Sequence, residues 1–168
     1  MEFYDVIRKR RSVRSYRPDP VPEASLRRIA EAVSLAPTAC NRQEIKILAV
    51  CDPALRRKVA SACPQKFLAE APVILIALAE TGRAWRRPDD GECIAALDAG
   101  IVLEHAVLAA AAEGLDSCWI CAYRRPDLNA ALGLDSGWTA LGVSPLGYGA
   151  EQPDRVGRRP LDETFEIR

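Results

Sequence analysis

The sequence predicts one domain over residues 1–168 that combines α-helices with a buried β-sheet, and three observations support this prediction. A length of 168 residues suits a single domain with a substantial core. Residues 71–78 form a continuous apolar run, which is typical of a strand buried on both faces of a sheet. Residues 92–113 are apolar almost all round, which predicts a central helix about 30 Å long.

The N-terminal pattern predicts two helices joined by an extended link. Apolar residues at helical spacing predict a short helix over residues 2–8, and an amphipathic pattern predicts a second over residues 23–35. The residues between them hold three prolines, which keep the backbone extended: Pro18, Pro20 and Pro22. Pro37 ends the second helix, so residues 36–43 form a loop of small and amide side chains.

The remaining pattern predicts alternating short strands and helices. We expect strands over residues 45–50, 71–78, 115–120 and within 138–148, and helices over residues 54–61, 92–113 and 126–132. Residues 81–91 are polar and predict a surface loop, in which Trp85 either packs against the domain or covers a flat ligand. A domain this small could barely enclose the 92–113 helix, which therefore predicts a dimer interface along it.

Composition excludes several functional classes. The formal net charge is zero, which argues against a general nucleic-acid binder. Residues 1–17 are charged and contain no apolar signal-peptide core, so we expect a cytoplasmic protein whose six cysteines are thiols. Residues 94–112 resemble a membrane span, but Asp98, Glu104 and His105 within them predict a buried helix of a soluble protein, not a membrane protein.

Residues 8–17 form the most strongly charged stretch, Arg-Lys-Arg-Arg-Ser-Val-Arg-Ser-Tyr-Arg, in which six of ten side chains are cationic. Forked guanidinium donors with a short hydroxyl nearby suit the oxygens of a phosphate. The alternative interpretation is a solvated basic surface. Residues 1–30 carry a local excess of four positive charges in a neutral chain, which favours one anion site.

Residues 118–121 form a Cys-x-x-Cys motif, Cys118-Trp119-Ile120-Cys121. A dithiol redox site places the first cysteine at a helix N-terminus, whereas here it falls in a predicted strand, whose alternation would turn the two thiols to opposite faces. The other cysteines provide no second ligand pair, so we expect no zinc site. His105 is the only histidine and belongs to the buried helix, so an enzymatic reaction would depend on a cofactor.

Separate stretches match one known pattern in order and spacing. They are Arg10-Arg11-Ser12-Val13-Arg14-Ser15-Tyr16, Ala36-Pro37-Thr38-Ala39-Cys40-Asn41-Arg42-Gln43, Asp98-Ala99-Gly100, Gly114-Leu115 before Cys118-Trp119-Ile120, Pro145-Leu146-Gly147-Tyr148, and Arg158-Arg159-Pro160-Leu161-Asp162-Glu163. Together they resemble the nitroreductase family of FMN-dependent NAD(P)H oxidoreductases. The resemblance implies an α+β fold with a mixed central β-sheet flanked by helices. It also implies a homodimer with the long helix at its core and two FMN molecules at the interface.

The resemblance also implies which residues bind FMN. By similarity, Arg10, Ser12 and Arg14 would hold the phosphate and ribityl chain, with Arg11 adding contacts and Arg158 and Arg159 completing the set. The isoalloxazine would be lined from the partner subunit by four loop residues: Pro37, Thr38, Ala39 and Asn41. Ile120 and Cys121 match the segment beside flavin N5, where the Cys121 amide rather than its sulfur would act.

The function implied by the resemblance is hydride transfer from NAD(P)H through flavin N5 to an electron-poor acceptor, such as a nitroaromatic or a quinone, by a ping-pong mechanism. No catalytic side chain is required. Two other functions stay open: a flavin-storage protein without turnover, and a dithiol oxidoreductase that uses Cys118 and Cys121. The tryptophan that often follows the small-residue loop in the family is absent, because Gln43 is followed by Glu44 and Ile45.

Overall fold

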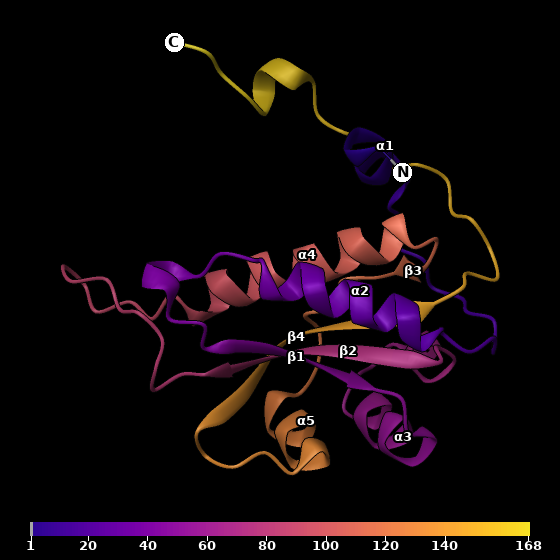
Figure 1. Ribbon diagram of the computed structural model, residues 1–168, viewed down its shortest axis with the longest axis horizontal. Helices are drawn as coiled ribbons and strands as arrows, with labels where there is room; N and C mark the ends of the chain where they lie inside the picture. The colour runs from indigo at the N-terminus through magenta and orange to yellow at the C-terminus, as the bar shows by residue number, and fades with distance from the viewer. Residues whose placement is uncertain (1) are drawn as a thin grey trace.

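The computed structural model describes residues 2–168, and a four-stranded sheet organises them in the order β1-β2-β4-β3 (Figure 1). The strands are β1 (Ile45–Val50), β2 (Val73–Glu80), β3 (Asp116–Ser117) and β4 (Trp138–Gly147). The ladders between these strands are antiparallel. The parallel part of the expected mixed sheet is an isolated bridge between Ser12 and Ser117.

Helices cover both faces of this sheet. The α-helices are α1 (Phe3–Lys9), α2 (Glu23–Ser34), α3 (Pro53–Ser61), α4 (Ala95–Ala112) and α5 (Arg125–Leu132). Figure 1 shows α2 and α4 on one face and α3 and α5 on the other. Short 3-10 helices lie at Ala39–Asn41, Lys66–Ala69 and Leu161–Glu163.

The strand β2 lies at the centre because both of its faces are apolar. Residues on a strand alternate between faces, so Ile74, Ile76 and Leu78 contribute to the core beneath α3 and α5. Leu75 and Ala77 contribute instead to the core beneath α2 and α4. The continuous apolar run in the sequence is therefore confirmed as a strand buried on both faces.

The predicted element bounds are confirmed at β1 and to within one residue at α1, α2, α3 and α5, whereas β2 lies two residues later than predicted. The long helix begins at Ala95 rather than residue 92, because Cys93 forms a bridge with Arg86 and the Glu92 carbonyl accepts from the N–H of Arg87. The predicted strand over residues 115–120 is shorter, since only β3 forms a ladder. Ile120 adds an isolated bridge to Val143. Trp85 is half-buried in the loop before α4.

The helix α4 has one covered and one open side. Residues such as Leu103, Ala106 and Ala110 are fully buried against the sheet and α2. On the open side, Leu97 is 62% exposed. By length and composition α4 could cross a membrane, but it is half-buried in the protein.

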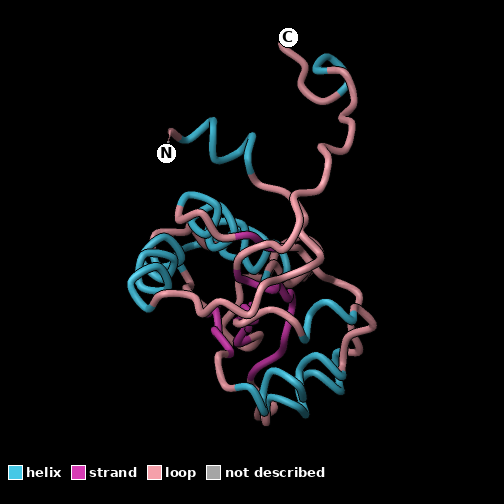
Figure 2. The backbone as a smooth tube through the Cα atoms, turned by 90° about the vertical axis from the view of Figure 1, so that its right-hand side faces the viewer, coloured by secondary structure: helices cyan, strands magenta, loops and turns pink. Residues whose placement is uncertain are grey.

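Both ends of the described chain project from the sheet and its helices (Figure 2). They carry exposed apolar side chains on α1 and along the C-terminal tail: Phe3, Tyr4, Ile7, Val156, Leu161, Phe165 and Ile167. Apolar surface of this extent is typical of protein contacts.

We expect Gly147→Ala to destabilise the fold by about 1–3 kcal/mol, because it adds a methyl group to a filled space. A Cβ at this position would lie 2.6 Å from Cδ of Pro72, and a proline ring cannot rotate away. Denaturant unfolding measures the loss. Gly157→Ala is the control, since its Cβ would meet no atom within 4 Å. Equal stability of the two variants would contradict this packing argument.

Candidate functional site

The basic segment, residues 8–17, is held in place by hydrogen bonds to β3 and to the residue that follows β4. The N–H of Val13 donates to the Ser117 carbonyl at 3.0 Å, and the N–H of Arg17 donates to the Tyr148 carbonyl at 2.9 Å. The Tyr16 hydroxyl donates to the Val13 carbonyl at 2.8 Å. Burial raises the pKa of Tyr16 well above its usual value, so it remains a neutral donor. Val13 and Tyr16 point into the core and leave Arg14 exposed.

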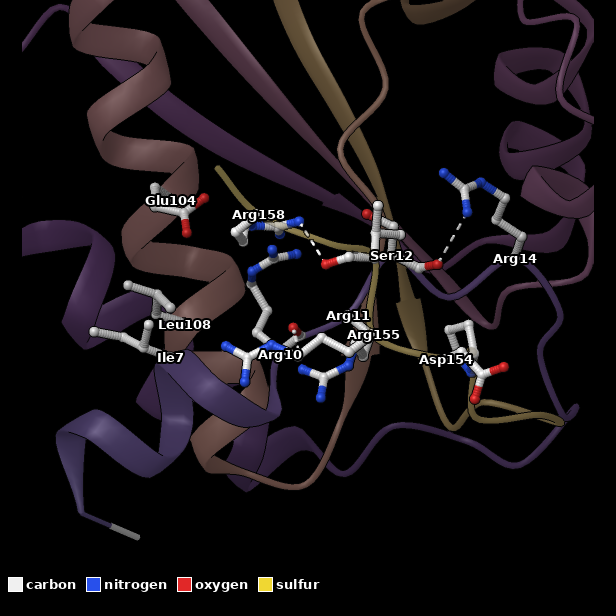
Figure 3. A pocket seen from close by; sticks show the side chains of 12 residues that line it. Ile7, Arg10, Arg11, Ser12, Arg14, Glu104, Leu108, Asp154, Arg155 and Arg158 are labelled. Atoms are coloured by element: carbon white, nitrogen blue, oxygen red, sulfur yellow. Dashed lines mark hydrogen bonds between the residues drawn. The ribbon is translucent and has the colours of Figure 1, made fainter. Parts of the chain in front are cut away.

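The hydroxyl and guanidinium groups of this segment line a cavity of about 580 Å³ beside α4 (Figure 3). Arg10, Ser12 and Arg14 line it, and the tail brings in Arg158 from the other end of the chain. Five of the residues predicted to bind FMN therefore meet here, including Arg11, although most of the sequence separates Arg158 from the other four. The full lining is Ile7, Arg10, Arg11, Ser12, Arg14, Glu104, Leu108, Pro153, Asp154, Arg155, Val156 and Arg158.

The charge of this cavity is strongly positive. Five arginines line it against two carboxylates, Glu104 and Asp154. Among residues 2–168, no carboxylate lies within 4.0 Å of these five guanidinium groups as an ion pair. Arginines that outnumber the nearby carboxylates and form no ion pairs with them favour a bound anion. The arginines are Arg10, Arg11, Arg14, Arg155 and Arg158.

Three of the five arginines are oriented by local backbone contacts. Arg11 Nη1 donates to the carbonyls of Arg8, Lys9 and Arg10 at the end of α1, the latter two at 3.1 Å. Arg14 Nη1 donates to the Ser12 carbonyl at 3.3 Å. Arg158 Nη1 donates to the Val156 and Gly157 carbonyls at 3.1 and 3.2 Å. Each planar guanidinium retains further donors for an anion.

The cavity differs from the sequence expectation at two arginines. Arg155 lines it and was not predicted, although its place three residues before Arg158 in a basic tail was a usable signal. Arg159 was predicted, but it is exposed and does not contribute to the lining. The α4 residues Glu104 and Leu108 were also missed, because only tertiary packing brings them here.

The loop over residues 36–43 lies elsewhere, at the N-terminal end of α4. The N–H of Ala39 donates to Oδ2 of Asp98 at 3.0 Å, and the N–H of Gln43 donates to the Thr38 hydroxyl at 3.0 Å. Cys40, Asn41 and Gln43 all have φ near +50°. This conformation costs free energy for residues other than glycine, so the surrounding contacts must hold it.

Within one chain this loop does not meet the cavity lined by the five arginines, which we call the arginine cavity. Pro37 and Asn41 are exposed, and Thr38 and Ala39 are half-buried. Asn41 instead borders a separate open cavity formed with the turn over residues 82–84. Along α4 the cavity begins about 9 Å from Asp98, at Glu104, and extends to about 15 Å from it, at Leu108.

The 118–121 segment turns its two cysteines to different environments. Cys118 is buried, and this burial raises the pKa of its thiol, against an opposing effect of Arg14. Cys121 is exposed. The N–H of Ile120 donates to the Val143 carbonyl at 2.9 Å, whereas no acceptor among residues 2–168 faces the N–H of Cys121. The Cys121 amide is therefore available to a ligand.

The open side of α4 forms a shallow apolar groove of about 460 Å³ that continues into the arginine cavity. Glu104 and Leu108 line both spaces. The other residues of the groove are Ala96, Leu97, Gly100, Ile101 and His105. Within the chain, Glu104 also accepts from Nε1 of Trp119 at 2.8 Å. A molecule packed along α4 would thus border the arginine cavity.

Comparisons with known proteins place these features in context. A family model described as "Nitroreductase family" matches residues 7–67 and 61–148. An NADH dehydrogenase of Thermus thermophilus is 34% identical, with 92% of this chain and 90% of that protein covered. An FMN reductase [NAD(P)H] of Bacillus subtilis is also 34% identical, over 68% of this chain and 51% of its own length.

The fold has solved counterparts. The crystal structure of a nitroreductase family protein from Clostridium difficile 630 superposes with a TM-score of 0.90 at 25% identity. The match covers 99% of this chain and 98% of that one. The expected architecture of a sheet flanked by helices is therefore confirmed.

Proposed function

Because the chain belongs to the nitroreductase family, we propose that it is an FMN-dependent NAD(P)H oxidoreductase acting on an electron-poor acceptor, such as a nitroaromatic or a quinone. The observation that carries the proposal is the cavity where Arg10, Arg14 and Arg158 converge around Ser12 and have no ion-pair partner among residues 2–168. We propose one FMN-binding domain over residues 1–168 and a cytoplasmic location. The relatives named NADH dehydrogenase and FMN reductase support the activity.

The residues of the cavity fit the phosphate of FMN. A phosphate monoester presents several acceptor oxygens and up to two negative charges, and the cavity offers guanidinium forks with a hydroxyl between them. Arg10, Ser12 and Arg14 would bind the phosphate and ribityl chain, with Arg11, Arg155 and Arg158 around them. Arg159 would stay outside the contact. FMN, when bound, supplies the hydride-accepting atom N5.

Other residues of the chain would orient the flavin ring. The free N–H of Cys121 can donate a hydrogen bond to the ring, while Ile120 fixes its position through two bonds to Val143. The buried strand β4 behind Ile120 makes this edge rigid. We propose a ping-pong cycle in which NAD(P)H and the acceptor use the same face in turn.

We propose that the site is completed in a homodimer. The Pro37–Asn41 loop and the arginine cavity are separate in one chain, but both adjoin α4. When two copies pack their α4 helices around a two-fold axis, the N-terminal end of each can approach the C-terminal half of the other. Pro37, Thr38, Ala39 and Asn41 of one subunit would then line the flavin ring held by the other. The continuous groove along α4 supports this arrangement.

An absorption spectrum of the purified protein, before and after addition of FMN, tests the proposal. We expect bound oxidised flavin, and bleaching of its bands by NADH or NADPH without oxygen, followed by recovery when a quinone or nitroaromatic is added. A protein that takes up no FMN would refute the proposal. Bound flavin that neither nucleotide reduces would favour the storage function instead.

We expect Cys118→Ser and Cys121→Ser, alone or together, to retain most of the NAD(P)H-dependent activity. Cys118 is buried with a raised thiol pKa, and Cys121 would act through its backbone amide, which the substitution keeps. Steady-state rates measured against the unmodified protein, with flavin content determined in parallel, provide the check. Loss of activity with full flavin content in the double variant would favour dithiol chemistry.

A further inference from the structure

Glu44 carries a buried carboxyl group that no other residue among 2–168 supplies with a hydrogen-bond donor. Its side chain is 0% exposed, although it directly follows an exposed loop. Neither Oε1 nor Oε2 receives a hydrogen bond from residues 2–168. An ionised carboxylate in this position would lose its hydration without any replacement, which strongly disfavours the charged form.

The surrounding charges do not neutralise Glu44. Asp98 on α4, itself only 2% exposed, is the carboxyl within hydrogen-bonding range. Arg83, in the turn after β2, is the cation that opposes the shift, but it is exposed and ion-paired with Oε2 of Glu80 at 3.2 Å. The charged groups that act on Glu44 are thus the Asp98 carboxylate and an arginine whose charge is already paired with Glu80. Two buried carboxyl groups in contact favour sharing one proton.

Asp98 and Glu44 anchor the two ends of the strained loop, Asp98 through its carboxyl group and Glu44 through its backbone carbonyl. Oδ2 of Asp98 accepts from the N–H of Ala39 at 3.0 Å. The carbonyl of Glu44 accepts from the N–H of Glu80 at 2.9 Å, which fixes the loop to β2. Between these anchors lie the left-handed residues Cys40, Asn41 and Gln43. Because the Glu44 and Asp98 side chains lie within hydrogen-bonding range, their interaction links the two ends of the loop.

We propose that Glu44 is a protonated positioning residue, whose O–H donates to the Asp98 carboxylate and thereby holds the 38–43 loop in its strained conformation. The proton satisfies one Glu44 oxygen and removes the like-charge repulsion. Asp98 retains its negative charge, which strengthens its bond to the Ala39 amide. The role in flavin binding rests on the proposed function, because this loop would line the ring in the partner subunit.

The proposal fixes the direction of a pH effect on stability. Burial is the main cause that raises the pKa of Glu44 above its usual 4.5, and Asp98 adds to it, while the backbone N–H of Glu44 itself and Arg83 oppose them. In the unfolded chain Glu44 ionises near its usual value, while in the folded chain it stays protonated. Its contribution to stability is therefore full at low pH and is lost as the pH rises from 4.5 through the folded pKa.

Thermal unfolding of the full-length protein and of Glu44→Gln, between about pH 5 and about pH 9, tests this linkage. The glutamine amide is neutral at every pH and can donate a hydrogen bond to Asp98, so the variant should not lose stability as the pH rises. We expect the Tm of the variant to rise relative to the unmodified protein as pH increases, by about 3–5 °C for each pH unit by which the folded pKa of Glu44 exceeds its unfolded value. A Tm difference independent of pH would overturn the proposal.

Two matched variants sharpen this test. Glu31→Gln makes the same chemical change at an exposed position on α2, and its Tm difference should not vary with pH. Asp98→Asn places an amide that can accept from the Ala39 N–H and donate to Glu44, so Glu44 can ionise at lower pH. The pH-dependent loss should therefore shrink in this variant. An unchanged loss would contradict the shared proton.

A carbon-NMR titration of glutamate side chains in the unmodified protein gives a measurement that needs no variant. One carboxyl carbon should remain in the protonated position after the exposed glutamates have ionised. If every glutamate titrates at the usual pH, Glu44 is not protonated and the proposal fails, whatever the folding of the variants.

Fluorescence titration of FMN at low and high pH then tests the positioning role. We expect the affinity of the unmodified protein to fall at high pH more steeply than that of Glu44→Gln. If the FMN affinities of the two proteins change with pH in parallel, Glu44 does not position the loop for flavin binding, although it is still protonated. Absence of FMN binding at every pH would instead refute the proposed function. The Tm and NMR results do not depend on flavin, so they would still test the protonation of Glu44.

Discussion

Replacing Arg10 or Arg14 with alanine is expected to weaken FMN binding about tenfold to a hundredfold. Each guanidinium would donate to the charged phosphate, and hydrogen bonds to charged groups contribute about 1.5–3 kcal/mol, which corresponds to this range in affinity. Both side chains line the cavity and neither has an ion-pair partner among residues 2–168 to compensate for its removal. Fluorescence titration of FMN into the flavin-free protein measures the dissociation constants.

Arg8→Ala is the matched control for these two variants. It removes the same charge from the same basic segment, but Arg8 is exposed, pairs with Asp5 at 3.2 Å and does not line the cavity. If general electrostatic attraction alone held FMN, the loss of one positive charge would weaken FMN binding equally in all three variants. Unchanged affinity in both Arg10→Ala and Arg14→Ala would show that the phosphate binds elsewhere.

Leu97→Asp is expected to raise the dimer dissociation constant about a hundredfold or more. In a two-fold interface along α4 each substitution occurs twice, and each copy removes about 1.5–3 kcal/mol of apolar burial and adds a desolvated charge. Leu97 is 62% exposed in the isolated chain, so the monomer itself should remain folded. Light scattering during size-exclusion chromatography gives the oligomeric state, and absorbance gives the flavin content.

The control for Leu97→Asp is Ala54→Asp, on an exposed position of α3 beyond the other face of the sheet. This variant should stay dimeric and retain flavin. Separation of Leu97→Asp into monomers with loss of FMN would support a site shared between subunits. A monomer that still binds FMN at full affinity would instead show that one chain holds a complete site.

The sequence predicted those parts of the fold that local chemistry determines. The bounds of β1 were correct because its apolar run is flanked by loop residues, and Gly133 ends α5 in the left-handed conformation expected of a helix C-terminus. Asp52 caps α3 by accepting from the N–H of Leu55 at 2.7 Å. These signals lie within a few residues of the elements they set.

The features missed by the sequence depend on contacts between distant segments. Glu44 is an ionisable residue next to a polar loop, and its burial near Asp98 of α4 depends on tertiary packing. Arg155 reaches the arginine cavity because the tail returns past α1, which no local pattern specifies. The start of α4 moved to Ala95 because the preceding loop pairs with itself through Arg86 and Cys93.

The residues Glu104 and Leu108, which border both the arginine cavity and the open groove of α4, have a thermodynamic consequence. In the proposed dimer, binding of FMN and association of the subunits share these side chains, so each process must favour the other by the same free energy. Dilution should then release the cofactor, and excess FMN should hold the subunits together at lower protein concentrations. Cofactor supply would thus regulate the amount of assembled protein.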